Sequence, residues 1–112
     1  MNQVFLSGVI AGKPTNLSQD AFTAHLSVPV AISHHTAAGV VKKEIFHVHA
    51  WRNVAVQLQK MAQAGARISV AGYLTQHMTP HGIQTAITAA EFHISDHVNE
   101  NKLESSKEEM NE

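Results

Sequence analysis

The stretch that decides the fold is Glu44-Ile-Phe-His-Val-His-Ala-Trp51, followed without a break by Arg52-Asn-Val-Ala-Val-Gln-Leu-Gln-Lys-Met-Ala-Gln-Ala64. Within 44–51, apolar residues at even positions alternate with histidines and Trp51 at odd positions. Such a period of two is typical of a β-strand. We predict that the face of this strand that packs into the core carries Phe46, Val48 and Ala50. The opposite face then carries Ile45, His47, His49 and Trp51.

The second part of the stretch predicts a helix over 52–64. Its apolar residues Val54, Leu58 and Met61 recur at helical spacing, and neither Gly nor Pro interrupts them. Gly65 supplies the stop that commonly ends such a helix. A strand therefore runs directly into a helix after Trp51.

Two strands are predicted before this unit. Residues 3–11 carry apolar side chains on both faces, which indicates a strand that also packs against a second surface. Residues 22–32 are apolar at the even positions, so this strand has one buried face. Pro29 has no N–H to donate to a neighbouring strand, so we expect it at a sheet edge or at a bulge.

Two more strands are predicted after the helix. Residues 66–77 place Ile68, Val70 and Leu74 inward, and residues 83–94 are rich in Ile, Thr and Ala, with a β-bulge expected around Ala89 and Ala90. Turn residues cluster at 12–16, 36–39 and 79–82. The order β-β-β-α-β-β is that of an OB-fold, a five-stranded Greek-key barrel with one helix between strands three and four. The alternative is an all-β roll in which the helix is an insertion between two strands.

The composition fits one small domain. The chain has 112 residues, of which 44% are hydrophobic, and it contains no cysteine. Disulfides, thiolate nucleophiles and cysteine zinc sites are therefore excluded. No apolar run approaches the ~20 residues that cross a bilayer, and the N-terminus lacks a basic and then apolar segment. We expect a cytoplasmic protein, which the lack of cysteine also fits.

Charge divides the chain near Asp96. Residues 1–95 carry six Lys and Arg against three Asp and Glu, whereas residues 96–112 carry two against six. The end of the chain has too few apolar residues to offset its ordering entropy. We therefore predict an OB-fold domain over 1–96 and a disordered acidic tail over 97–112.

No motif for catalysis is recognisable in the sequence. It contains no nucleophile elbow, no phosphate-binding glycine loop and no carboxylate pair. We therefore predict a binding module without a cofactor rather than an enzyme.

Three segments carry a family resemblance: Leu6-Ser7-Gly8, Phe46-His47-x-x-Ala50-Trp51, and Gly65-x-Arg67-Ile68-x-Val70-x-Gly72-Tyr73-Leu74-x-x-His77. Together they resemble the primosomal replication protein N family, dimeric OB-fold proteins of bacterial replication restart, within the wider group of bacterial single-stranded DNA-binding proteins. The resemblance covers residues 1–96. It implies single-stranded DNA as ligand, a homodimer, and contacts with a restart helicase and other primosome proteins.

Aromatic residues are the first candidates for the binding surface. Trp51 is the only tryptophan and lies opposite the core stripe, where it predicts a stacking platform for a base. Packing under the helix or in a dimer contact is the alternative. The resemblance implies Phe46 as a second binding aromatic, but its alternation with Val48 favours the core. Tyr73 is predicted either to stack on a base or to lie in a subunit contact.

Basic residues and histidines complete the candidate surface. Lys42, Lys43 and Arg52 flank the third strand and either bind phosphate or are ordinary solvated charges. His47 and His49 share one face of that strand, but no third ligand suggests a metal site. These two residues, together with His77 and His81, are expected to line the groove. If they titrate near pH ~6.5, their protonation should strengthen DNA binding as the pH falls from about 8 to about 6.

One departure from the family lowers the expected affinity for DNA. The family carries phosphate-binding lysines in the loop between strands four and five, whereas this chain has Met78-Thr79-Pro80-His81 there. Two other functions stay open, a general single-stranded DNA-coating protein and an OB-fold module for RNA or protein interaction. Coating proteins usually end in an acidic tip with a hydrophobic anchor. The stretch Glu108-Glu-Met-Asn-Glu112 is acidic but lacks such an anchor, which favours the restart accessory.

Overall fold

The structure is a computed structural model that describes residues 1–17 and 24–95. Its elements are β1 (Val4–Ile10), β2 (Thr15–Asn16), β3 (His25–His35), β4 (Val41–Trp51), α1 (Arg52–Met61), β5 (Arg67–Thr79) and β6 (Gly82–Ile94). The predicted order is confirmed, with the two-residue β2 as an addition. The predicted tail over 97–112, and the boundary before it, lie outside the described residues. Within those residues, no helix is long and apolar enough to span a membrane.

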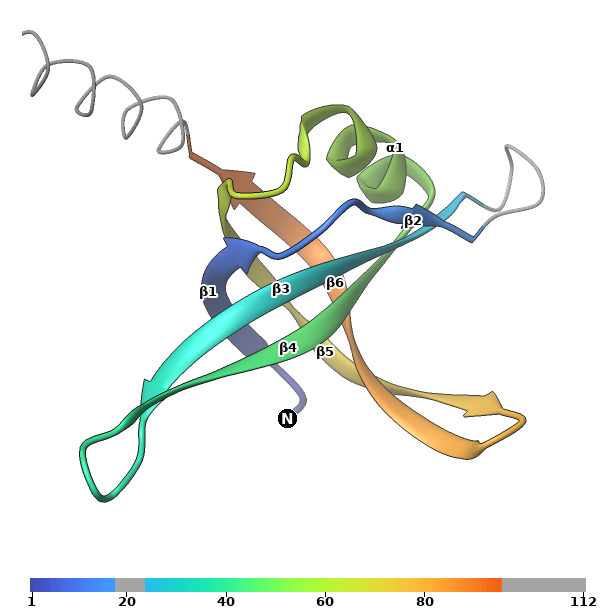
Figure 1. Ribbon diagram of the computed structural model, residues 1–112. Helices are drawn as coiled ribbons and strands as arrows, with labels where there is room; N and C mark the ends of the chain where they lie inside the picture. The colour runs from blue at the N-terminus through green and yellow to red at the C-terminus, as the bar shows by residue number, and fades with distance from the viewer. Residues whose placement is uncertain (18–23, 96–112) are drawn as a thin grey trace, which may run out of the picture.

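Five long strands close into a barrel. The sheet order is β1-β5-β6-β4-β3-β2, and an additional pairing between β1 and β3 closes the ring (Figure 1). All neighbours are antiparallel except β4 and β6, which run parallel and pair only at Val48↔Ile87 and His49↔Thr88. This is the OB-fold that the sequence predicts.

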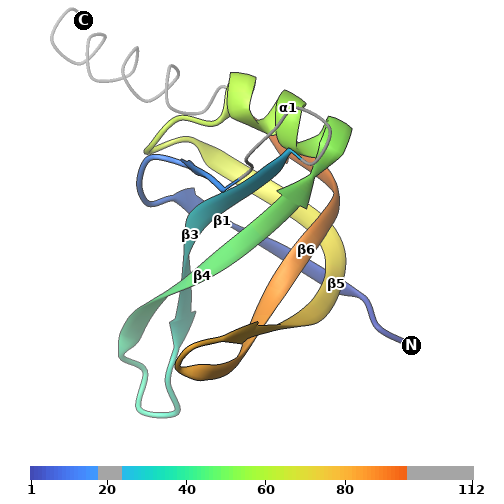
Figure 2. The ribbon, with the colours of Figure 1, turned by 90° about the vertical axis from the view of Figure 1, so that its right-hand side faces the viewer.

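The barrel interior is filled by apolar side chains at alternating positions along the strands. Its largest fully buried side chains are those of Ile10, Leu26, Leu58, Ile68, Val28, Val30 and Val48. Burial of each such side chain stabilises the fold by about 1.5–3 kcal/mol. Leu58 comes from α1, which lies across one end of the barrel, whereas the β3–β4 and β5–β6 hairpins extend beyond the other end (Figures 1 and 2).

The hairpins overturn two predictions of burial. Leu74 has the same parity on β5 as the buried Ile68, yet it is 49% exposed, and Phe46 on β4 is 40% exposed. Both strands outrun the barrel, so their inward face loses the opposing wall that would cover it. The prediction of a core position for Phe46 is therefore wrong, and so is that of an inward Leu74. Alternation along a strand gives the face of a residue but not where the barrel ends.

Pro29 lies within a continuous antiparallel register, because it pairs with His47 of β4 without a bulge. Its carbonyl oxygen accepts a hydrogen bond from the Ala11 N–H at 2.8 Å on the opposite side of β3. That side is where β1 has ended at Ile10 and β2 begins only at Thr15. The missing N–H of Pro29 therefore faces a break in the pairing, as expected of a local edge.

The helix is shorter than predicted and ends at Met61 rather than Ala64. Ala62 adopts an extended backbone, and the N–H of Gly65 donates to the Ile10 carbonyl at 2.8 Å. Gly65 has a φ of +94°, which an L-residue rarely adopts. The chain therefore leaves the helix early to bond to β1. Met61 is 49% exposed rather than inward.

The bulge expected around Ala89 and Ala90 is confirmed. Ala71 pairs with Glu91, but the next residue of β5, Gly72, pairs with Ala89. Ala90 is therefore the extra residue, and it bends β6 around the barrel.

Candidate functional site

Four aromatic rings from three strands form a continuous row, which we call the ring column: Trp51, His25, His49 and His77. The rings of His25 and Trp51 are stacked, with centroids 3.7 Å apart and an interplanar angle of 9°. His49 lies 4.9 Å from His25 and also 4.9 Å from His77, at angles of 33° and 24°. The rings of the column therefore contact one another in sequence across the barrel surface.

Strand register produces this arrangement. His25 opens β3 and pairs directly with Trp51, the last residue of β4. His49 precedes Trp51 by two residues and so points to the same face of β4. His77 is carried by β5, whose hairpin with β6 approaches β4 from the other side. The predicted residues Trp51, His49 and His77 are thus brought together.

His25 belongs to the site, although the sequence reasoning did not select it. Counting equal distances from the predicted turn at 36–39 pairs residue 25 with Ala50, whereas the observed loop also includes Val40, which shifts the partner of His25 to Trp51. His25 also lies at an odd position of 22–32, whereas the apolar residues of that strand lie at the even positions.

The two central histidines share a hydrogen bond and stay neutral. The His25 Nε2 and the His49 Nδ1 atoms lie 2.7 Å apart, so one ring donates and the other accepts. Burial, together with the nearby imidazoles of His25, His77 and His47, lowers the pKa of His49 to about 4. Burial and then His77 also lower the pKa of His25. The expected protonation of His49 near neutral pH is therefore wrong, because its ring is desolvated among other imidazoles.

A groove of about 530 Å³ lies beside the ring column, between β4 and β6. Its walls are Ser27 of β3, the four side chains of residues 45–47 and 49 on β4, and residues 84–86 of β6. Phe46 and His47 line it as predicted candidates. The lining contains no Lys, Arg, Asp or Glu, so the groove offers rings, amides and hydroxyls rather than fixed charge.

None of the three basic candidates Lys42, Lys43 and Arg52 lines the groove. Lys43 shares the parity of His47 and Trp51 on β4, whereas Lys42 points to the opposite face. Arg52 follows Trp51 with a φ of +55°, in the left-handed region. Of the three predicted cations, Lys43 therefore shares the strand face of His47 and His49, and Arg52 directly follows Trp51.

The remaining candidates stand apart from the ring column. Tyr73 is 42% exposed and lies on the same face of β5 as His77, about 13 Å along the strand. His81 lies exposed in the turn between β5 and β6, where its N–H bonds to the Thr79 hydroxyl at 3.1 Å. Within the described part of the chain, no group of three His, Asp or Glu residues could hold a metal ion.

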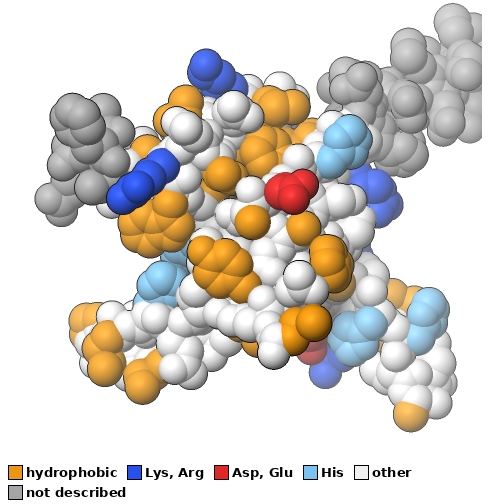
Figure 3. Space-filling model, turned by 180° about the vertical axis from the view of Figure 1, so that it is seen from behind, with side chains coloured by type: hydrophobic (Ala, Val, Ile, Leu, Met, Phe, Trp, Pro, Cys, Tyr) orange, Lys and Arg blue, Asp and Glu red, His pale blue; other side chains and the backbone are white. Residues whose placement is uncertain are grey.

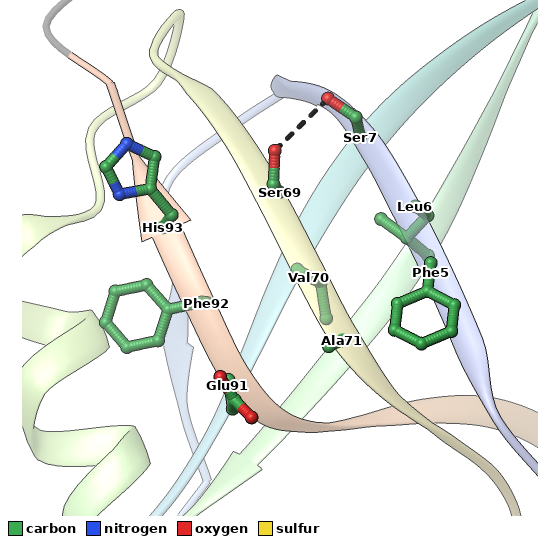
Figure 4. A pocket seen from close by; sticks show the side chains of 9 residues that line it. All are labelled: Phe5, Leu6, Ser7, Ser69, Val70, Ala71, Glu91, Phe92 and His93. Atoms are coloured by element: carbon green, nitrogen blue, oxygen red, sulfur yellow. Dashed lines mark hydrogen bonds between the residues drawn. The ribbon is translucent and has the colours of Figure 1, made fainter.

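A second surface lies on the outer face of β1, β5 and β6. A hollow of about 460 Å³ there is lined by Phe5, Ser7, Ser69, Glu91, Phe92 and His93, together with Leu6, Val70 and Ala71 (Figure 4). From behind, hydrophobic side chains are spread over this region with few charged ones among them (Figure 3). The side chain of Phe5 is 75% exposed.

Strand β1 beside this hollow has an open edge. It pairs with β5 from Val4 to Val9, but with β3 only at Val9 and Ile10. Among the described residues, positions 4–7 therefore have no strand paired on their second side, whereas Gly8 already lies against the Ala31 backbone of β3. Such an edge is a template for pairing with another strand.

The class of protein is defined by the closed barrel with its helix after the third long strand, which is an OB-fold. No curated protein and no protein-family profile matches the sequence. Solved structures do share the fold. The wild-type single-stranded DNA binding protein from Thermus aquaticus is 18% identical with a TM-score of 0.74, and the match covers 86% of this chain and 50% of that one.

Two further structures are similar. A deletion mutant of the Thermus aquaticus protein is 17% identical, with a TM-score of 0.69 over 86% of this chain and 51% of that one. The SSB domain of a Synechococcus sp. protein is 22% identical, with a TM-score of 0.64 over 83% of this chain and 94% of that one. This chain spans about half the length of both Thermus aquaticus chains. At these identities, the likeness establishes the fold.

Proposed function

We propose that this protein binds single-stranded DNA along the groove, with one base stacked on Trp51. The observation that carries the proposal is the ring column next to a groove without charged side chains. Stacking on an aromatic side chain contributes about 1–3 kcal/mol per base and tolerates any sequence, because every base has a π-face. Similar folds in proteins named for binding single-stranded DNA support the same ligand.

In this proposal, Lys43 and Arg52, which lie near opposite ends of β4, give the bound strand its electrostatic contacts. Lys43 lies eight residues before Trp51 on β4, which places it about 27 Å away along an extended strand. Arg52 lies at the other end. A bound strand then has its bases in the uncharged groove and its backbone near one cation at each end.

A replication-restart accessory role is the finer form of this proposal, and it includes a homodimer. The resemblance of the sequence to primosomal replication protein N supports the role. The open edge of β1 and the exposed Phe5 beside it support the dimer, since a second β1 would satisfy the free backbone groups. Sedimentation at tens of micromolar tests the dimer, and a species near 12 kDa would contradict it.

The binding proposal is tested with a labelled oligothymidine and the variant Trp51→Ala. We expect the variant to bind about 5- to 100-fold more weakly, in keeping with the loss of one stacked base. Val56→Ala is the matched control, since Val56 is an exposed apolar residue on α1, away from the groove. Equal affinity of parent and Trp51→Ala would remove this face from the binding site. An oligouridine arm decides between DNA and RNA.

A further inference from the structure

We propose that His25 is a positioning residue: it covers one face of Trp51 and holds the other face outward for a single base. This inference rests on the proposed function and names the residue that prepares the stacking surface. The evidence is the stack of these two rings, the hydrogen bond between His25 and His49, and the attachment of the column to the barrel wall.

The stack leaves Trp51 with one usable face. At a centroid distance of 3.7 Å and an angle of 9°, the imidazole of His25 already fills the space that a base would take on that side. Trp51 is nevertheless 39% exposed, so part of its surface stays open to solvent. A base can therefore extend the column at its Trp51 end without separating any pair of rings.

The backbone fixes the same pair. His25 and Trp51 are direct cross-strand partners, and the N–H of Arg52 donates to the Ala24 carbonyl at 2.8 Å, one step beyond them. The two side chains therefore project from an end of the hairpin that this backbone hydrogen bond holds in place. Because the orientation of Trp51 is set before a ligand arrives, binding a base costs less side-chain entropy.

The far side of His25 is anchored to a buried group. The column continues from His49 to His77, whose Nε2 lies 3.4 Å from the Thr75 hydroxyl. That hydroxyl lies 2.9 Å from the hydroxyl of Thr88, which is 5% exposed and pairs with His49 across the β4–β6 contact. A chain of contacts therefore connects the surface indole to the barrel wall, and His25 is its link to Trp51.

The experiment compares His25→Ala, His25→Phe and His93→Ala in the full chain. Trp51 is the only tryptophan, so its fluorescence anisotropy in the free protein reports its own mobility. Affinity is measured with a labelled oligothymidine. His25→Phe keeps a flat ring against the indole but lacks the nitrogen that bonds to His49. His93 lies on the β1–β5–β6 face and is the matched histidine control.

We expect His25→Ala to lower the anisotropy of Trp51 and to weaken binding roughly 3- to 10-fold, as for loss of one aromatic contact. His25→Phe, which keeps the ring contact but loses the bond to His49, should recover both values in part, and His93→Ala should change neither. Unchanged anisotropy or unchanged affinity in a folded His25→Ala variant would overturn the inference. So would a His25→Phe variant that behaves like His25→Ala. If the parent protein does not bind the oligonucleotide, the proposed function fails, and the anisotropy alone decides whether His25 positions Trp51.

Discussion

Gly72 lies directly against the carbonyl group of Thr88, so a β-carbon on residue 72 would collide with that oxygen. The contact falls at the bulge where β6 gains Ala90, and it allows β5 to pass close to β6 as both strands bend. We expect Gly72→Ala to lower the free energy of unfolding by about 1–3 kcal/mol, because backbone on both strands must shift. Urea denaturation measures this change.

Gly12→Ala is the matched control for that variant. A β-carbon on Gly12 would lie 3.6 Å from the Pro29 side chain, which is ordinary van der Waals contact. Its stability should stay within about 0.5 kcal/mol of the parent. A Gly72→Ala protein as stable as the control would show that the strands at the bulge separate without cost.

Acid should destabilise the fold through His49. In the unfolded chain His49 takes up a proton near its ordinary pKa of 6.5, whereas in the folded protein it does so only near 4. The folded state therefore binds fewer protons between these values, and stability falls as the pH drops through this window. The lowered pKa of His25 acts in the same direction.

Melting temperatures at pH 7.5 and 5.0 measure this effect. His49→Gln lacks the titrating group and should show a smaller drop between the two pH values than the parent. An equal drop in both proteins would place the acid sensitivity elsewhere, in carboxylates or other histidines.

DNA binding should depend only modestly on salt. With two phosphates neutralised, by Lys43 and Arg52, the slope of log K against log salt should be roughly −1.4. Lys43→Gln should make the slope shallower by about 0.7, whereas Lys42→Gln, on the opposite face of β4, should not change it. A slope near −6 would mean that phosphate contacts dominate and that the uncharged groove contributes little.

Arg52→Gly should stabilise the protein, although it removes a cation from the proposed site. The φ of +55° at Arg52 costs an L-residue roughly 1 kcal/mol that glycine does not incur. We therefore expect the free energy of unfolding to rise by about 0.5–1 kcal/mol, read from the urea midpoint. Arg67→Gly, at an exposed strand position of β5, should instead be destabilising. The same sign for both variants would contradict the strain at residue 52.

Local patterns in the sequence predicted the element order and the bulge at Ala89–Ala90 correctly. Both depend on neighbours in the chain, namely alternation, helical spacing and turn residues. The exposure of Phe46 and Leu74 could not be predicted in this way, since it depends on how far two hairpins extend beyond the barrel. The early end of α1 likewise depends on a bond from Gly65 to the distant Ile10.

The candidate site was predicted in part for a similar reason. Trp51 was found because it is a single aromatic on the outward face of one strand. The rest of the ring column could not be predicted without tertiary information. His25 joins it through the pairing of β3 with β4, and His77 joins it because β5 approaches β4. The neutral state of His49 follows from that assembly, so a pKa near the ordinary value was the natural expectation from sequence.

Like the β1–β3 contact that closes the ring, the parallel contact between β4 and β6 consists of only two residue pairs, so it is a narrow seam at which the barrel can open. His49 and Thr88 form one of these pairs, so the middle of the ring column lies directly over this seam. A strand of DNA bridging β4 and β6 would hold both sides of the seam together. Amide hydrogen exchange at residues 48–49 and 87–88 should therefore slow on binding. The slowing should exceed what direct coverage of these amides by DNA would cause, because opening of the barrel would also be suppressed.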